Sequence, residues 1–130
     1  MMFRISSRHF LPKVPVYVNS RTLYCEVPSN ETEKQQGLKD RDILFEHQGM
    51  LFDVGGRYQP LFTMRDVKFD LEAIFIGNDR KIKDIVPMKK MDGSTAYTTP
   101  LRVPIRFVIE MNKGYCSKYG IELGDVVRIN

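Results

Sequence analysis

The stretch LFTMRDVKFDLEAIFIG, residues 61–77, carries the main evidence for the fold of this chain. It sets charged side chains among residues that otherwise favour burial. Its last residue begins the segment Gly77-Asn78-Asp79-Arg80, which is the strongest hairpin signal in the sequence, because turn-forming residues here separate two apolar runs. We therefore predict an antiparallel hairpin with strands at 70–76 and 81–87.

Short strand signals recur on both sides of this hairpin. β-Branched and aromatic residues predict strands at 14–19 and 21–27, joined by a tight turn at Asn19–Ser20. Gly55 and Gly56 predict a flexible loop that runs to residue 60. Further strands are expected at 49–54, 61–64, 102–112 and 126–129.

Two short helical segments interrupt the strands. Asn30 and Glu33 have the spacing of a capping box, and Gly37 follows, so a two-turn helix is expected over residues 31–36. A single turn is expected at 114–119, before Gly120. Pro104 lies inside the 102–112 strand and favours an edge position or a bulge at that point.

These elements predict an all-β fold with minor α content. About eight short strands with one or two short helices indicate a compact β-sandwich or β-barrel. A chain of 130 residues and 15.1 kDa is the size of one domain. We assign a single β-sandwich domain to residues 14–130, and a basic N-terminal arm with the first strands to residues 1–25.

The net charge of +4 lies entirely in this N-terminal region. Arg4, Arg8, Lys13 and Arg21 are the only charged residues before Glu26. Of the 20 basic residues, sixteen then remain to balance the 16 acidic ones, so the body is neutral. The arm is a candidate surface for other protein subunits or a nucleic-acid backbone; the alternative is a solvated arm.

Several function classes find no support in the sequence. There is no apolar run of about 20 residues, so membrane insertion is not expected. No secretory signal is recognisable, so a cytoplasmic protein is expected, and a virion component remains open. Cys25 and Cys116 are expected to be reduced core residues. Metal-ligand spacing, a phosphate loop, a dinucleotide fingerprint and a nucleophile elbow are all lacking, so neither a metal nor a cofactor is expected.

The order of several motifs resembles a known family. The motifs are Gly-Leu at 37–38, Gly-Met-Leu-Phe at 49–52, Phe-Thr-Met-Arg-Asp at 62–66, Phe-Val-Ile-Glu at 107–110, Asn-Lys-Gly at 112–114, Gly-Ile at 120–121 and Gly-Asp at 124–125. Over about residues 31–130 the chain resembles the uncharacterised bacterial and archaeal family called domain of unknown function 192. The resemblance implies a β-rich sandwich or barrel with minor helices and no established activity. That family also occurs in bacteriophage genomes.

The chain departs from the pattern of that family at positions suited to binding. Thr63 stands where the family has Trp, Asp66 where it has Asn, and Val67 where it has Thr. Glu72 stands where it has Asp. The positions that match are mostly Gly, Met, Phe and Ile. The resemblance therefore implies a member that kept the scaffold and changed the site.

Two groups of polar residues are candidate sites. Asp66, Asp70 and Glu72 form either a carboxylate cluster or a salt-bridged solvent face with the neighbouring cations. Glu110 lies in an apolar strand, where a buried carboxylate is expected to pair with Arg102, Arg106 or Arg65. The alternative is a ligand pocket, for which we nominate Arg65, Asp66, Asp70 and Glu110.

Three functional hypotheses follow. The first is a non-enzymatic structural or adaptor domain of a larger assembly, including a phage particle, anchored by the basic arm through Arg4, Arg8, Lys13 and Arg21. The second is a module that binds a small ligand or peptide through the four nominated residues. The third, a hydrolase that uses Asp66 and Asp70, ranks last, because no catalytic constellation accompanies these carboxyl groups.

Overall fold

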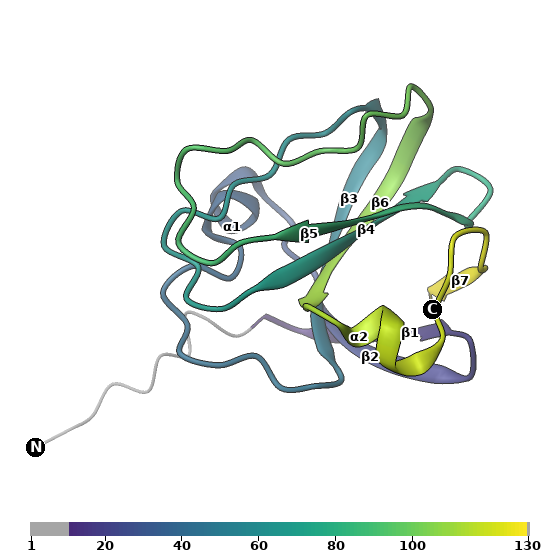
Figure 1. The fold of residues 1–130 in the computed structure, drawn as a ribbon, viewed down its shortest axis with the longest axis horizontal. Coiled ribbons are helices and arrows are strands. Elements are labelled where there is room, and N and C mark those ends of the chain that lie inside the picture. Colours follow the sequence, from purple (N-terminus) through teal and green to yellow (C-terminus); the bar gives the residue numbers. More distant parts are fainter. Residues whose placement is uncertain (1–10, 130) are drawn as a thin grey trace, which may run out of the picture.

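The computed structural model describes residues 11–129, and in them seven strands form a single twisted sheet (Figure 1). The order of strands across the sheet is β5-β4-β6-β3-β2-β1-β7. The all-β class with minor α content is confirmed. The elements are β1 (Lys13–Val18), β2 (Arg21–Glu26), α1 (Glu31–Gln36), β3 (Gln48–Tyr58), β4 (Leu71–Gly77), β5 (Ile82–Met88), β6 (Pro104–Asn112), α2 (Tyr115–Tyr119) and β7 (Val127–Ile129).

Both predicted hairpins form. β4 and β5 pair antiparallel around the 77–80 turn, and β1 and β2 pair antiparallel around Asn19–Ser20. Asn19 and Ser20 have φ angles of 51° and 65°, as expected in a two-residue hairpin turn that matches the twist of the strands. β2 and β3 pair in parallel, which requires the long crossover that contains α1.

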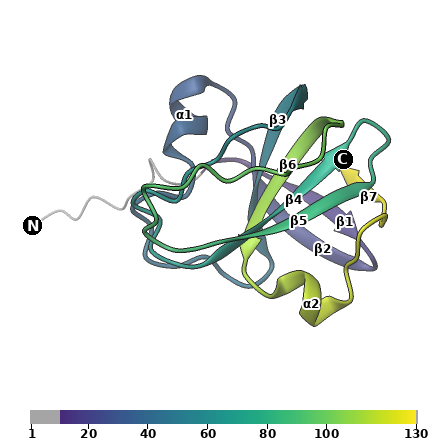
Figure 2. The ribbon, with the colours of Figure 1, turned by 45° about the horizontal axis from the view of Figure 1, so that its top comes forward.

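The sheet curls until its two edge strands meet at one point. Lys81, before β5, bridges to Val126, before β7, and the Val127 N–H donates to the Arg80 carbonyl at 2.8 Å. The curled sheet and α2 enclose the first core cluster (Figure 2). Its fully buried members include Val16, Leu23, Cys25, Ile74, Ile76, Ile82, Ile109 and Met111.

A second core cluster lies on the other face of the sheet. α1 and the long connections 37–47, 59–70 and 89–103 gather on this side of β3, β4 and β6, away from α2 (Figure 2). The cluster includes Leu38, Met50, Phe52, Met64, Val67, Leu71, Ala73, Phe75 and Val108. Two apolar layers on one sheet explain why β4 is buried at every position.

Two local predictions are wrong. Gly55 and Gly56 do not open a loop, because both lie within β3 and form a bulge with φ angles of 67° and 83°. Residues 61–64 form no regular strand, since only Phe62 pairs, with Tyr97. Pro104 begins β6, a central strand, where a missing N–H costs least, and the register of β6 against β4 shifts directly after it, between Ile105 and Phe107.

Candidate functional site

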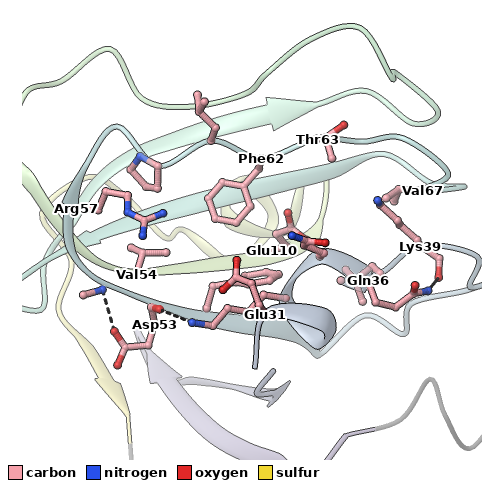
Figure 3. Close-up of a pocket in the computed structure, with 18 residues that line it drawn as sticks. Glu31, Gln36, Lys39, Asp53, Val54, Arg57, Phe62, Thr63, Val67 and Glu110 are labelled. Carbon is pink, nitrogen blue, oxygen red and sulfur yellow. Dashed lines mark hydrogen bonds between the residues drawn. The ribbon is translucent and has the colours of Figure 1, made fainter. Parts of the chain in front are cut away.

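A cavity of about 450 Å³ opens between α1 and the second face of the sheet (Figure 3). β3 and β6 form its floor, α1 with residues 37–39 forms one wall, and residues 60–63 form the other. The apolar lining comes from Leu38, Phe52, Val54, Pro60, Leu61, Phe62 and Val67. Its size is within the range of small-molecule sites, about 300–1,000 Å³.

Local sequence signals place α1 beside this cavity. The Asn30 side chain accepts from the Glu33 N–H at 2.9 Å, and the Glu33 carboxylate accepts from the Ser29 N–H at 2.8 Å. Gly37 then ends the helix with a positive φ of 49°. The chain therefore turns at once and inserts Leu38, which is buried, into the second core cluster.

Glu110 lies at the floor of the cavity (Figure 3). Its strand neighbours are Met50 on β3 and Ala73 on β4, so the carboxyl group stands among apolar side chains. Glu110 is 5% exposed, and its carboxyl group has no hydrogen bond or ion pair with any residue in 11–129. Burial raises its pKa from 4.5 to about 8, because an ion is poorly solvated there.

The predicted ion pair of Glu110 is wrong, because two of its candidate partners bind elsewhere. Arg106 donates to both carboxylate oxygens of Asp53, at 3.1 and 3.2 Å. Arg65 donates to the Gly93 carbonyl at 2.9 Å. Arg102, the third candidate, is exposed in the chain before β6.

Of the four nominated ligand-binding residues, only Glu110 lines the cavity. Arg65 and Asp66 are exposed, and the Asp66 carbonyl accepts from the Asp40 N–H. The Asp70 carboxylate accepts from the Lys90 N–H at 2.9 Å. These interactions organise the loops that cover the second core cluster.

Two members of the predicted carboxylate cluster, Asp70 and Glu72, bind different partners in different parts of the fold. Glu72 is buried and accepts from the Gly114 and Cys116 N–H groups, at 2.9 and 2.8 Å, so it holds the start of α2. Asp70 precedes β4 and is held by Lys90 instead. Asp70 and Glu72 are two residues apart, a spacing that within one strand would place both side chains on the same face, but Asp70 lies outside β4.

Charged side chains line the cavity nearer to solvent. Lys34 and Lys39 come from α1 and the turn after it, and Arg57 comes from the end of β3. Lys34 donates to the Asp53 carbonyl at 3.4 Å. For Lys39 and Arg57, no side-chain partner is found within residues 11–129. The acids of this rim are Glu31 and Asp53, and the Arg106 guanidinium lowers the pKa of Asp53.

The family of the chain follows from a match over most of its length. The model of the DUF192 family, described as an uncharacterized ACR, matches residues 14–129. This chain belongs to the DUF192 family. The resemblance inferred from the sequence motifs is thereby confirmed.

Two solved structures are similar over most of both chains. A protein of unknown function from Novosphingobium aromaticivorans DSM 12444 is 28% identical, with a TM-score of 0.83 over 98% of this chain and 91% of that one. A protein from Sinorhizobium meliloti 1021, described as a candidate transcription regulator, is 25% identical, with a TM-score of 0.80 over 90% and 93%. No curated protein matches.

Two departures from the DUF192 pattern fall on the cavity. Thr63 and Val67 both line it, at the positions where the resemblance leads us to expect Trp and Thr. Glu110, which matches the pattern, lines the same cavity.

Sequence reasoning missed most of the cavity. A residue pattern does not single out Lys39 and Arg57. Lys39 comes two residues after Gly37 and Arg57 directly after Gly56, and the positive φ angles of these glycines redirect the chain in a way that the pattern does not show. Phe62 and Thr63 lie in the 61–77 stretch, where the residue pattern predicts a strand over 61–64. The apolar context of Glu110 was the one signal that pointed to the site.

The residues nominated for partner binding are only partly described. Arg4 and Arg8 lie outside the described residues. Lys13 is exposed at the start of β1, and the Arg21 guanidinium stacks on the Tyr119 ring at 4.4 Å from its centre. Arg21 therefore already makes a contact within the domain.

Metal-binding groups and membrane-spanning helices can be assessed over residues 11–129. Within this range, no three His, Cys, Asp or Glu side chains are grouped so that they could hold a metal ion. The helices of the same range are too short or too polar to cross a membrane. Cys25 and Cys116 are both buried free thiols.

Proposed function

We propose that this DUF192 protein is a binding module for a small polar organic molecule, which occupies the cavity between α1 and the sheet. The observation that carries the proposal is Glu110. A buried carboxyl group without a partner in the described chain costs stability, and a well-packed apolar residue would avoid that cost. Glu110 lines the cavity, so a ligand there is the natural partner for its carboxyl group.

The surroundings of Glu110 support this role. Apolar side chains of Phe52, Val54 and Phe62 provide surface for the body of a ligand, and a single polar group at the floor can fix its orientation. A structural acid within the sheet would instead be expected to have hydrogen-bond donors around it, as Glu26 has in Arg41, at 2.5 and 2.9 Å.

A ligand screen with a plugged variant tests the proposal. The ¹⁵N-labelled full chain is screened by NMR against mixtures of polar metabolites, and we expect hits that shift the amide signals of residues 36–39, 52–57 and 60–63. Val54→Trp places an indole in the cavity and should abolish those shifts. Leu123→Trp adds an indole in an exposed loop and should preserve them.

Two results would contradict a binding role. One is a screen without a single hit on these amides. The other is a set of hits that Val54→Trp, with an otherwise native amide spectrum, leaves unchanged, because such ligands would bind elsewhere.

An assembly role is a second proposal, and a different observation favours it. All of the net charge lies in residues 1–25, whereas the remainder of the chain is balanced. Such an arm suits an acidic partner subunit or a phosphate backbone in a larger particle. Both proposals can hold for one chain, since the arm and the cavity use different residues.

A further inference from the structure

The mouth of the cavity has an excess of positive charge. Lys34, Lys39 and Arg57 line it, against the acids Glu31 and Asp53. Asp53 is already neutralised by the two hydrogen bonds from Arg106. Lys39 and Arg57 are the rim cations with no side-chain partner in residues 11–129. Figure 3 shows Lys39 and Arg57 at opposite ends of the cavity, so an anionic group at either end would find an unengaged cation.

The floor of the cavity presents a neutral acid. With a pKa of about 8, the Glu110 carboxyl group is mostly protonated at pH 7 and can donate a hydrogen bond. Its partner on the ligand must then be an acceptor. An amine at this position would first require ionisation of Glu110, which costs a factor of about ten in affinity at pH 7.

Apolar walls separate the mouth from the floor. Phe52, Val54 and Phe62 line the cavity together with Arg57 and Glu110. Figure 3 shows Glu110 between Arg57 at one end of the cavity and Lys39 at the other. This layout suits a ligand with a short apolar body and different polar groups at its two ends.

We infer that the cavity takes a small organic anion whose anionic group lies beside Lys39 or Arg57, at one end of the cavity, and whose uncharged acceptor, a carbonyl or hydroxyl oxygen, lies against Glu110. This inference rests on the proposed binding function and names its ligand class. Keto acids and hydroxy acids with a short hydrocarbon chain have this chemistry.

Four five-carbon probes separate the two ends of the site. They are 4-oxopentanoate, with both groups; pentanoate, with only the anion; 2-pentanone, with only the acceptor; and pentylamine, with a cation. NMR titration of the full chain at pH 6.5 should give 4-oxopentanoate at least about tenfold tighter binding than each of the other three, as expected for two polar contacts of ordinary strength.

Variants test which residues contact the anionic group of the ligand and which contact its uncharged acceptor. Lys39→Ala with Arg57→Ala should weaken 4-oxopentanoate about tenfold and leave 2-pentanone unchanged. The charge-matched control, Lys113→Ala with Arg128→Ala, removes two cations outside the cavity and should change neither. Glu110→Gln retains an uncharged donor and should bind 4-oxopentanoate within about threefold of the wild type.

The pH dependence gives a second readout. Above pH 8 the affinity of wild type for 4-oxopentanoate should fall toward tenfold per pH unit, because Glu110 ionises, loses its donor and repels the anion. Glu110→Gln should show no such fall. The charged groups that line the cavity around Glu110 are Glu31 and Lys34 on α1, Lys39 after it, and Asp53 and Arg57 on β3.

Three outcomes would contradict either the inferred ligand class or the proposed binding function. Tightest binding of pentylamine, lost in Glu110→Gln, would assign the floor to a cation; the anion inference would fail and the binding function would stand. The anion inference also fails, and the binding function again stands, if none of the four probes binds while a screened metabolite does. If neither probes nor metabolites bind the cavity, the proposed function itself fails.

Discussion

Glu110 is buried at the floor of the cavity, where an ionised carboxylate is poorly solvated. Its raised pKa, about 8 against an ordinary 4.5, means that the folded chain holds this proton more tightly than the unfolded chain does. The proton therefore stabilises the fold fully below about pH 4.5, and that contribution disappears as the pH rises through about 8.

Replacement of this one acid should remove that dependence. For wild type, the free energy of unfolding should fall by on the order of 4 kcal/mol between pH 4.5 and 8, from Glu110 alone. Glu110→Gln should lack this component and be the more stable protein at pH 9. Urea unfolding of both proteins at pH 5, 7 and 9 checks the difference. If the difference in the free energy of unfolding between wild type and Glu110→Gln is the same at all three pH values, that result contradicts a raised pKa of Glu110.

Gly49 shows how tightly the floor of the cavity is built. A Cβ atom at Gly49 would lie 2.7 Å from the backbone oxygen of Glu110, a distance that requires β3 or β6 to move. Gly49→Ala should therefore destabilise the fold by about 1–3 kcal/mol and shift the amide signal of Glu110. Gly93→Ala is a milder control, because its nearest neighbour is the flexible Arg65 guanidinium, at 3.2 Å.

At the scale of elements, α1 matters as a wall of the cavity more than as a source of stability. None of its residues is buried, and its placement depends on the Asn30 cap and on Leu38 behind it. Asn30→Ala should lower the free energy of unfolding by about 1 kcal/mol, as is typical of an N-cap. It should also weaken ligand binding, since a frayed α1 loosens the wall that carries Lys34.

Calorimetry and the NMR titration measure these two effects separately. Thr32→Ala, at an exposed position within α1, leaves the cap intact and serves as the matched control. Loss of stability without loss of affinity would show that α1 does not shape the bound state.

The hairpins and α1 could be predicted from the sequence because their signals are local. Turn residues at 19–20 and 77–80, and the Asn30–Glu33 spacing, act within a few residues of one another. The Gly55–Gly56 bulge and the irregular 61–64 segment could not be predicted, because their conformations depend on Ile105 across the sheet and on Tyr97 in another loop.

The candidate site was predicted only in part for the same reason. Glu110 was found because a carboxyl group in an apolar strand is a local anomaly. Its expected arginine partners bind Asp53 and Gly93, and those pairings are set by the tertiary fold. Lys39 and Arg57 line the same cavity although one follows α1 and the other lies near the end of β3, and the tertiary fold sets that arrangement.

At the scale of the whole molecule, the arm and the body have different charge. The arm hypothesis predicts that association with acidic partners is lost when residues 1–10 are removed, because Arg4 and Arg8 are removed with them. Native mass spectrometry of full-length and truncated chains, in low and high salt, measures this. A full-length chain that stays monomeric and free of partners in low salt would contradict an assembly role.

The most direct test of an unpaired acid in the cavity is the titration of Glu110 itself. In the full chain with ¹³C-labelled glutamate, the carboxyl signal that disappears in Glu110→Gln is followed from pH 3 to pH 10. We predict a midpoint at about pH 8. A midpoint near the ordinary value of 4.5 would mean that Glu110 is hydrated or paired, and it would contradict the cavity described above.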